Sequence, residues 1–430
     1  MSLQDRYGNA LGTQSVAARD AYQSGVDSLM AATPGMDTAF QKSVEADENF
    51  ALGHISLARA KQLLGRGHEA KAPLARAKEL AANASPREQS QIAIFEKILT
   101  GQGAAALEAI REHMKEWPRD AMALAPATSV FGLIGFSGQV GREVDQLALL
   151  EPFEKHYGDD WWYRTQLAFA QIELQKLDEG RRNIDAALDA YPKSAHAAHI
   201  RGHLFYELGE REAGLAFLKD WMKDYSRDGL MHVHNNWHLA LWSMETGRMD
   251  DAWRIYDAAL SPSVAWGPQV NVATDCPAFL ARAEMAGEPR QVARWRELAD
   301  YATKWFGRPG LGFVDMHTVL AYAMAGDGAA LAKFIETPKG ATADMLPALA
   351  HGFEAYAQGD WTRAIEAIEP LLATHERLGG SRAQRDLLEY VVTSAMVKAG
   401  RATEARAMIE KRRPQNGKGK GFPLAGLMSS

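Results

Sequence analysis

The sequence is poor in cysteine, with Cys276 the single one among 430 residues. One thiol excludes a disulfide within the chain, and the lack of a cysteine pair fits a reducing compartment. The first residues, Met1-Ser2-Leu3-Gln4-Asp5, lack the cationic and then apolar pattern of a secretion signal. We therefore expect a cytoplasmic protein.

Long apolar runs and an excess of one charge are also missing. The most apolar window, residues 122–136, is too short to span a bilayer and contains Pro126, Gly132 and Gly135. The 48 basic and 54 acidic residues are interspersed and give a net charge of −6. No basic stripe forms, so neither a membrane nor a nucleic acid is an expected partner. Glycine-rich phosphate loops, dinucleotide fingerprints and Gly-x-Ser-x-Gly elbows are absent too, which disfavours nucleotide, nicotinamide and serine-hydrolase chemistry.

Strand-like alternation is absent, and a helical repeat takes its place. A small residue is followed by an apolar residue four positions later and by a small or apolar residue three positions after that. Copies of this offset begin at Ala70, Gly180, Ala252 and Ala364, with a partial copy at Ala405. They match the second half of a tetratricopeptide unit, and each follows a helical stretch that ends in a glycine or polar turn. The pattern predicts helical hairpins of roughly 34 residues.

We predict an all-α fold in which residues 1–412 form a single solenoid of tetratricopeptide-like hairpins. The repeat is degenerate at 86–150 and 265–340, and residues 413–430 have the composition of a flexible tail. Stacked hairpins of this kind curl into a superhelix whose first helices, meaning the first helix of each hairpin, line the concave side. We expect an enclosed concave groove there.

Two histidine clusters lie on predicted first helices of consecutive hairpins. Six of the 13 histidines fall between residues 196 and 203 or between 232 and 238. Each cluster contains a His-x-x-x-His pair, His199/His203 and His234/His238, and on a helix this spacing places both imidazoles on one face. We expect at least three of these four rings to converge.

The chain resembles the tetratricopeptide repeat protein 38 family over residues 155–412. The similarity is carried by His199-x-x-x-His203, by His234-Asn235-Asn236-Trp237-His238-Leu239-Ala240-Leu241, by Asp275 within Ala-Thr-Asp-Cys-Pro-Ala-Phe-Leu, by Asp315-Met316-His317, and by Gly379-Gly380-Ser381-Arg382-Ala383-Gln384-Arg385-Asp386. The family has no firmly assigned activity, so the resemblance implies the fold and the location of a site more than a reaction. Relatives carry a carboxylate where this chain has Tyr206, with Glu207 beside it.

The histidine pairs allow three interpretations. They satisfy hydrogen bonds between packed helices, they hold a divalent transition metal, or they serve metal-free acid–base or ligand-binding chemistry. No glutamate follows the first histidine as in His-Glu-x-x-His, which excludes the zinc-protease pattern. The candidate catalytic set comprises His199, His203, His234, His238, Asp275 and Asp386, and the candidate metal ligands are the four histidines.

Other polar and aromatic residues near these motifs are candidates for binding a ligand. Trp237 offers a flat wall, and the Arg382/Arg385 pair offers a clamp for a carboxylate or phosphate. The full substrate-binding set is Trp237, Asn235, His317, Arg382, Gln384 and Arg385. We expect residues 379–386 to return towards the histidine clusters.

Two function classes remain open. The first is an enzyme that acts on a small anionic or aromatic metabolite, with a histidine-bound metal or His/Asp acid–base chemistry. The second is a scaffold that binds a peptide or protein in its groove, the usual use of this architecture. The density of His, Trp, Asp and Arg on first helices favours the first class.

Overall fold

Residues 2–412 are described by a computed structural model of the chain. Their regular structure is helical, apart from one isolated bridge between Gln4 and Ala10. No helix in this part of the chain has the length and apolar character needed to cross a membrane. The predicted tail at 413–430 lies outside the described residues.

Contacts divide the chain into two compact units. The first comprises the chain up to residue 135, residues 143–201 and residues 225–231. The second comprises residues 136–142, residues 202–224 and the chain from residue 232 onward. The boundary at residue 201 falls inside one helix, α12 (Ala195–Leu208). One uninterrupted solenoid over 1–412 stays a prediction.

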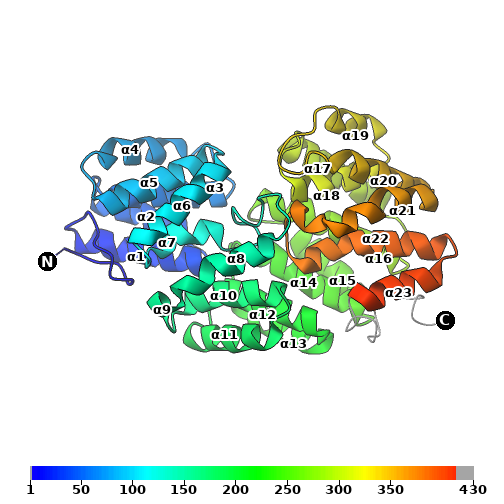
Figure 1. Cartoon of the computed structure of the whole chain (residues 1–430), viewed down its shortest axis with the longest axis horizontal. Helices are drawn as coiled ribbons and strands as arrows, with labels where there is room; N and C mark the ends of the chain where they lie inside the picture. The colour runs from blue at the N-terminus through cyan, green and yellow to red at the C-terminus, as the bar shows by residue number, and fades with distance from the viewer. Residues whose placement is uncertain (1, 413–430) are drawn as a thin grey trace. The chain divides into compact units, whose positions relative to one another are not determined.

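The first unit consists mainly of antiparallel helix pairs (Figure 1). Its helices are α1 (Val16–Ala31), α2 (Met36–Ala46), α3 (Ala51–Leu63), α4 (Lys71–Ala81), α5 (Pro86–Leu99), α6 (Gly103–Glu116), α7 (Ala121–Leu124), α9 (Glu154–Tyr157), α10 (Trp161–Glu173), α11 (Leu177–Ala190) and most of α8 (Arg142–Leu150). Helices α1 and α2, α3 and α4, α5 and α6, and α10 and α11 form hairpins.

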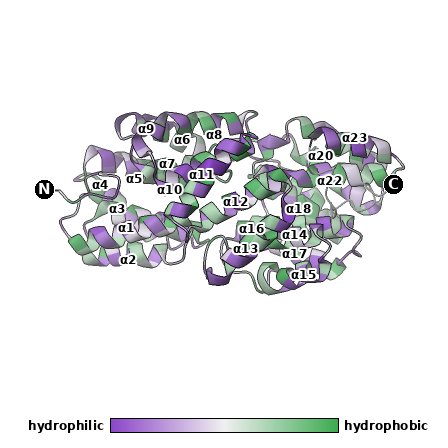
Figure 2. Cartoon of the chain, turned by 90° about the horizontal axis from the view of Figure 1, so that it is seen from below, coloured by the Kyte–Doolittle hydropathy of each residue, from purple (hydrophilic) through white to green (hydrophobic). Residues whose placement is uncertain are grey.

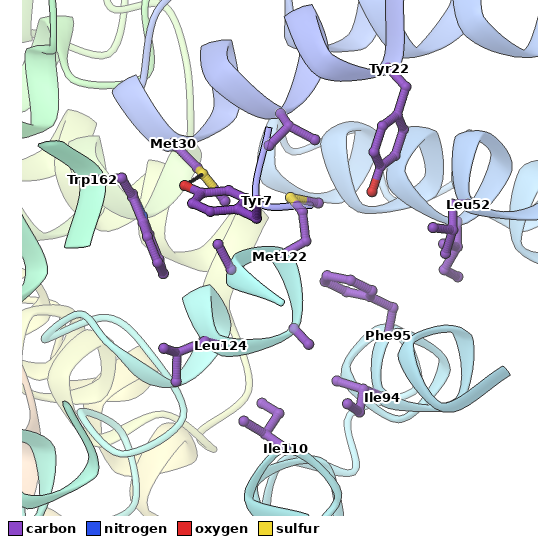
Figure 3. Packing of buried hydrophobic residues seen from close by; sticks show 14 of the residues in the cluster. Tyr7, Tyr22, Met30, Leu52, Ile94, Phe95, Ile110, Met122, Leu124 and Trp162 are labelled. Atoms are coloured by element: carbon purple, nitrogen blue, oxygen red, sulfur yellow. Dashed lines mark hydrogen bonds between the residues drawn. The ribbon is translucent and has the colours of Figure 1, made fainter. Parts of the chain in front are cut away.

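The core of the first unit is apolar and close-packed. Tyr7 of the N-terminal segment, Tyr22 and Met30 of α1, Phe95 of α5 and Trp162 of α10 converge in it (Figure 3). The phenol hydroxyl of Tyr7 donates to the sulfur of Met30 over 3.5 Å. Each hairpin buries its apolar face against its neighbours, as expected of a repeat stack.

The second unit repeats the hairpin pattern. Its helices are α13 (Arg211–Trp221), α14 (His232–Glu245), α15 (Met249–Ile255), α16 (Gln269–Met285), α17 (Val292–Phe306), α18 (Gly312–Ala325), α19 (Gly328–Ile335), α20 (Leu346–Gln358), α21 (Trp361–Ile368), α22 (Arg382–Lys398) and α23 (Ala402–Arg412). A π-helical turn over Tyr256–Leu260 continues α15. The first helices α14, α16, α18 and α20 pack side by side in sequence order.

The first helices α16 and α22 also contact each other, although two hairpins separate them in the sequence. The chain therefore turns back on itself within this unit, and side chains of α16 and α22 meet in its interior. This contact brings the start of α22, which carries residues 382–386, next to α16. Helix α16 in turn packs against α14, the helix that carries His234 and His238.

The local reasons for these helices are visible in the sequence. Ser381 caps α22 by accepting a hydrogen bond from the Gln384 amide, and Ser85 caps α5 in the same way with Glu88. Close helix pairs need small residues: a Cβ at Gly180 would lie 2.6 Å from Cγ1 of Ile172. Hydrophilic and hydrophobic residues alternate around individual helices (Figure 2). The all-helical, hairpin-based fold is thus confirmed.

Candidate metal centre

The two His-x-x-x-His pairs project from α12 and α14. His199 and His203 lie one turn apart on α12, and His234 and His238 lie one turn apart on α14. One ligand atom from each imidazole can be chosen so that all four lie within 4.8 Å of one another. All four residues are buried, and none is more than 5% exposed. The convergence that the spacing predicts is therefore present.

His238 lies at the centre of these rings. Its ring centroid is 4.9 Å from that of His203 and 4.9 Å from that of His234, and both contacts are close to perpendicular. Burial lowers the pKa of His238 well below its usual range, and His203, His234 and Arg282 lower it further. A neutral imidazole keeps a nitrogen lone pair, which is the form that binds a metal.

Asp275 fixes the orientation of His234. Its carboxylate, on α16, lies 2.8 Å from Nδ1 of His234, and only 1% of the aspartate is exposed. With Nδ1–H donating to the carboxylate, Nε2 carries the lone pair. Metal-binding histidines generally donate their other ring N–H to a carboxylate or carbonyl in this way.

Trp237 and Arg282 extend the site beyond the histidines. The indole of Trp237 is stacked on the His234 ring at 5.2 Å and meets the His238 ring edge-on at 4.9 Å. The guanidinium carbon of Arg282 lies 5.5 Å from the centre of the same indole. Sequence reasoning did not single out Arg282. The available signal was its position seven residues after Asp275, which places both side chains on one face of α16.

Asn235 is buried beside the ligand histidines without hydrogen bonds. It is 0% exposed, and neither its side-chain oxygen nor its side-chain nitrogen has a partner among residues 2–412. The indole N–H of Trp237 is likewise without an acceptor in that part of the chain. Asn235 precedes His238 by three residues, so the two side chains are neighbours on α14. Buried polar groups of this kind are rare in folded proteins.

His317 has a separate environment. It lies on α18, and its Nδ1 donates to the carbonyl of Phe313 over 2.7 Å. Burial lowers the pKa of His317 to about 4, against the raising effect of that hydrogen bond. Arg282 lowers it as well, so the guanidinium acts on both His238 and His317. His317 is not one of the four convergent histidines.

Residues 379–386 return to α12 and α16, as predicted. The hydroxyl of Tyr206 donates to Asp386 over 2.6 Å, and Arg282 donates to the carbonyl of Ala383 over 2.8 Å. Arg382 lies 3.4 Å from the Glu207 carboxylate.

The other predicted residues of this stretch have structural contacts. Arg385 donates to the carbonyl of Gly380, its neighbour across the start of α22. The side-chain oxygen of Gln384 accepts hydrogen bonds from the backbone and hydroxyl of Ser381, at 3.0 and 3.2 Å, as part of the helix cap. A role for either in binding a ligand stays a prediction.

No protein-family model matches the chain. Among solved structures, the P58(IPK) TPR domain is similar with 12% identity and a TM-score of 0.22, over 90% of this chain and 99% of that one. The structure of Naa15/Naa10 bound to HypK-THB is similar with 12% identity and a TM-score of 0.23, over 94% of this chain and 58% of that one. The tetratricopeptide-like character of the fold rests on the hairpins themselves. The resemblance to the repeat protein 38 family stays a prediction.

Proposed function

We propose that this protein binds a divalent transition metal through His199, His203, His234 and His238. The observation that carries the proposal is the convergence of four buried imidazoles, whose ligand atoms lie within 4.8 Å of one another. Four nitrogens bound tetrahedrally to zinc at about 2.0–2.1 Å stand about 3.3 Å apart, so modest side-chain rotation closes the set. Zinc, iron, copper and nickel all accept imidazole ligands.

Helix packing alone does not explain why four histidines are buried together. Four contiguous imidazoles lose solvation on burial and repel one another if they are charged. A carboxylate that orients one of them adds a feature of metal sites that a packing interface does not need. Acid–base chemistry would use the same nitrogen lone pairs as the metal, and their convergence on one volume favours the metal.

A metal with an open coordination position would also bind a small-molecule ligand. Zinc bound by four imidazoles is saturated, because catalytic zinc keeps one of four positions open. A metal that accepts five or six ligands retains open positions even with all four histidines bound. We infer that a small anionic or aromatic molecule binds there, beside the Trp237 indole.

Metal analysis tests the proposal directly. The purified protein, dialysed against zinc, cobalt or nickel and then against buffer, is expected to retain about one ion per chain. His203→Gln and His238→Gln should each lower the retained metal several-fold. Asp275→Asn leaves the four histidines in place and should weaken metal affinity by about 10–100-fold. His317→Gln, a buried histidine outside the cluster, is the matched control and should retain wild-type metal content.

Circular dichroism melts of each variant separate loss of metal from loss of fold. A wild-type protein that retains none of these ions would overturn the metal centre. Equal retention by the wild type and by both histidine variants would move the binding elsewhere in the chain.

A protein-binding scaffold is the second candidate. It is supported by the hairpin architecture and by large apolar side chains that the second unit exposes, with Trp266 at 41%, Val292 at 45% and Trp305 at 45%. A scaffold of this kind does not require the buried histidines. Variants that abolish metal binding but keep the fold therefore distinguish the two candidates by whether partner binding survives.

A further inference from the structure

We propose that the ligand of this metal centre is an oxyanion, held by the guanidinium of Arg282 and by the side-chain amide of Asn235. The inference rests on the proposed metal site and specifies the chemical class of its ligand. A carboxylate and a phosphate ester both present the required oxygens.

Arg282 is a buried cation without a carboxylate partner. It is 1% exposed, and it donates to the backbone carbonyls of Ala383 at 2.8 Å and Ala278 at 3.3 Å. Its guanidinium carbon lies 5.5 Å from the ring centres of both Trp237 and Tyr390. Among residues 2–412 Arg282 forms no ion pair, and the carboxylate of Glu245, whose pKa the charge of Arg282 lowers, pairs with Arg211 instead. A buried cation without an ion-pair partner is stabilised by an anion that binds directly to it.

Arg211, another buried arginine of this unit, pairs with a carboxylate instead. Arg211 is 9% exposed, and its Nε lies 2.8 Å from the carboxylate of Glu245. Arg282 differs from it in facing aromatic rings and carbonyls.

The position of Arg282 relates it to the metal ligands. Asp275 and Arg282 project from the same face of α16, and that face meets α14: Asp275 contacts His234, and Arg282 contacts Trp237. The Trp237 indole contacts both His234 and His238. A ligand bound to the metal beside this ring is therefore close to the guanidinium.

The unsatisfied groups of α14 fit an oxygen-rich ligand. The amide of Asn235 has unbonded donors, and the Trp237 indole N–H is a further donor without an acceptor among the described residues. Both residues are 0% exposed, so bulk water does not supply the missing acceptors. An oxyanion has several acceptor oxygens and can bond to the metal, the amide and the guanidinium together. It would also offset the positive charge that a metal adds to a site with Arg282.

A structural role for Arg282 is the competing explanation. By bonding to Ala383, Arg282 ties α16 to the start of α22, and this tie alone would make its loss destabilising. It would not make anion affinity depend on Arg282. The test therefore needs a binding readout beside a stability readout.

Cobalt-loaded full-length protein provides that readout, because an anion that enters the metal's coordination shell changes the visible spectrum of cobalt. Inorganic phosphate and acetate are titrated in separate arms, and equilibrium dialysis with labelled phosphate gives an independent dissociation constant. We expect saturable binding of at least one anion, and the tighter arm identifies the phosphate or carboxylate class. Arg282→Gln and Asn235→Leu should weaken that anion at least tenfold while cobalt affinity stays within about twofold of wild type.

Two further variants separate an effect on anion binding from an effect on folding. Arg282→Lys keeps the charge and should lie between wild type and Arg282→Gln in anion affinity. Arg87→Gln, which breaks the buried ion pair with Asp120 in the first unit, should reduce stability and leave anion affinity unchanged. Cobalt binding without saturable binding of either anion would overturn this inference alone, as would wild-type anion affinity in Arg282→Gln. Failure of the wild type to bind cobalt would overturn the metal centre and this inference with it.

Discussion

Cys276 and Asp275 are sequence neighbours on α16 with unlike surroundings. The thiol of Cys276 is fully buried and donates to the carbonyl of Leu260 over 3.1 Å. Burial raises the pKa of this thiol well above its usual range, and the charge of Asp275 raises it further. A thiol held protonated is a poor nucleophile and a poor metal ligand. The metal-centre role accordingly falls to the imidazoles.

We expect Cys276→Ser to leave fold and metal content nearly intact. A hydroxyl can donate to the Leu260 carbonyl as the thiol does, so the cost should be at most about 1–2 kcal/mol for burying a more polar group. Denaturant unfolding and metal analysis of the variant measure both quantities. Loss of metal or activity with unchanged stability would instead make Cys276 a ligand or nucleophile.

At the scale of single elements, the repeat offsets located the second helices correctly. The copies that begin at Ala70, Gly180, Ala364 and Ala405 fall on α4, α11, α21 and α23 or directly before them. The copy from Ala252 runs from α15 into the π-helical turn. Where the offsets blur, at 265–340, α16 to α19 still pair as hairpins. Alanines spread along α16 supply the small contact surface there without the repeated spacing.

The cap of α22 supports the element that carries residues 382–386. Ser381 is 0% exposed and forms a capping box with Gln384. We expect Ser381→Ala to lower the free energy of unfolding by about 0.5–2 kcal/mol, because a buried donor at the helix start loses its acceptor. Urea unfolding followed by circular dichroism measures the change.

Ser85→Ala is the matched control, since Ser85 forms the same capping box on α5 from an exposed position. Water can replace part of the lost bond there, so the loss should be smaller. Equal stability of Ser381→Ala and wild type would contradict the importance of this cap.

At the scale of the whole molecule, buried neutral histidines couple stability to pH. Burial lowers the pKa of His196 to about 4 and the pKa of His317 to about 4, and it lowers that of His238 as well. The unfolded chain binds protons at these positions near pH 6.5, and the folded chain does so only at lower pH. Stability is therefore fully present above pH 6.5 and falls as the pH drops below it.

Asp315 opposes this trend in part. Burial raises its pKa to about 6, against hydrogen bonds from the backbone of Gly310 and Leu311. The folded chain therefore binds a proton here that the unfolded chain releases, and this contribution grows as the pH falls through 6. Burial also raises the pKa values of Asp5, Asp27 and Glu245, which act in the same direction as Asp315. The three histidines begin to lose stability already at their unfolded pKa near 6.5, so we expect a net loss of stability as the pH falls from neutral.

We expect the free energy of unfolding of the metal-free protein, measured by urea titration, to decrease as the pH is lowered from 7.5 to 5.5. Each such histidine contributes at most about 1.4 kcal/mol per pH unit, so His317→Gln should reduce the slope by up to that amount. His68→Gln is the control, because the side chain of His68 is 81% exposed. A free energy of unfolding that does not change with pH would contradict the prediction. So would a pH slope in His317→Gln equal to that of the wild type.

The sequence by itself determined how residues within one helix lie relative to each other. The backbone hydrogen bonds of a helix fix the relation between residues four apart, so the pairing of His199 with His203 and of His234 with His238 could be read from spacing. Caps and small residues are local in the same sense, which is why Ser381 and the repeated offsets were informative.

Only the tertiary structure decided which faces meet. The rotation from one hairpin to the next is set by side-chain packing, and no local rule gives its sum over several hairpins. The contact of α16 with α22, and with it the position of Arg282 against Ala383, depends on that sum. For the same reason the contacts of Arg382 with Glu207 and of Arg385 with the carbonyl of Gly380 could not be predicted from the sequence. Arg282 belongs to no motif that the sequence analysis identified. It lies over Trp237, the ring that contacts His234 and His238, because of how α16 packs against α14.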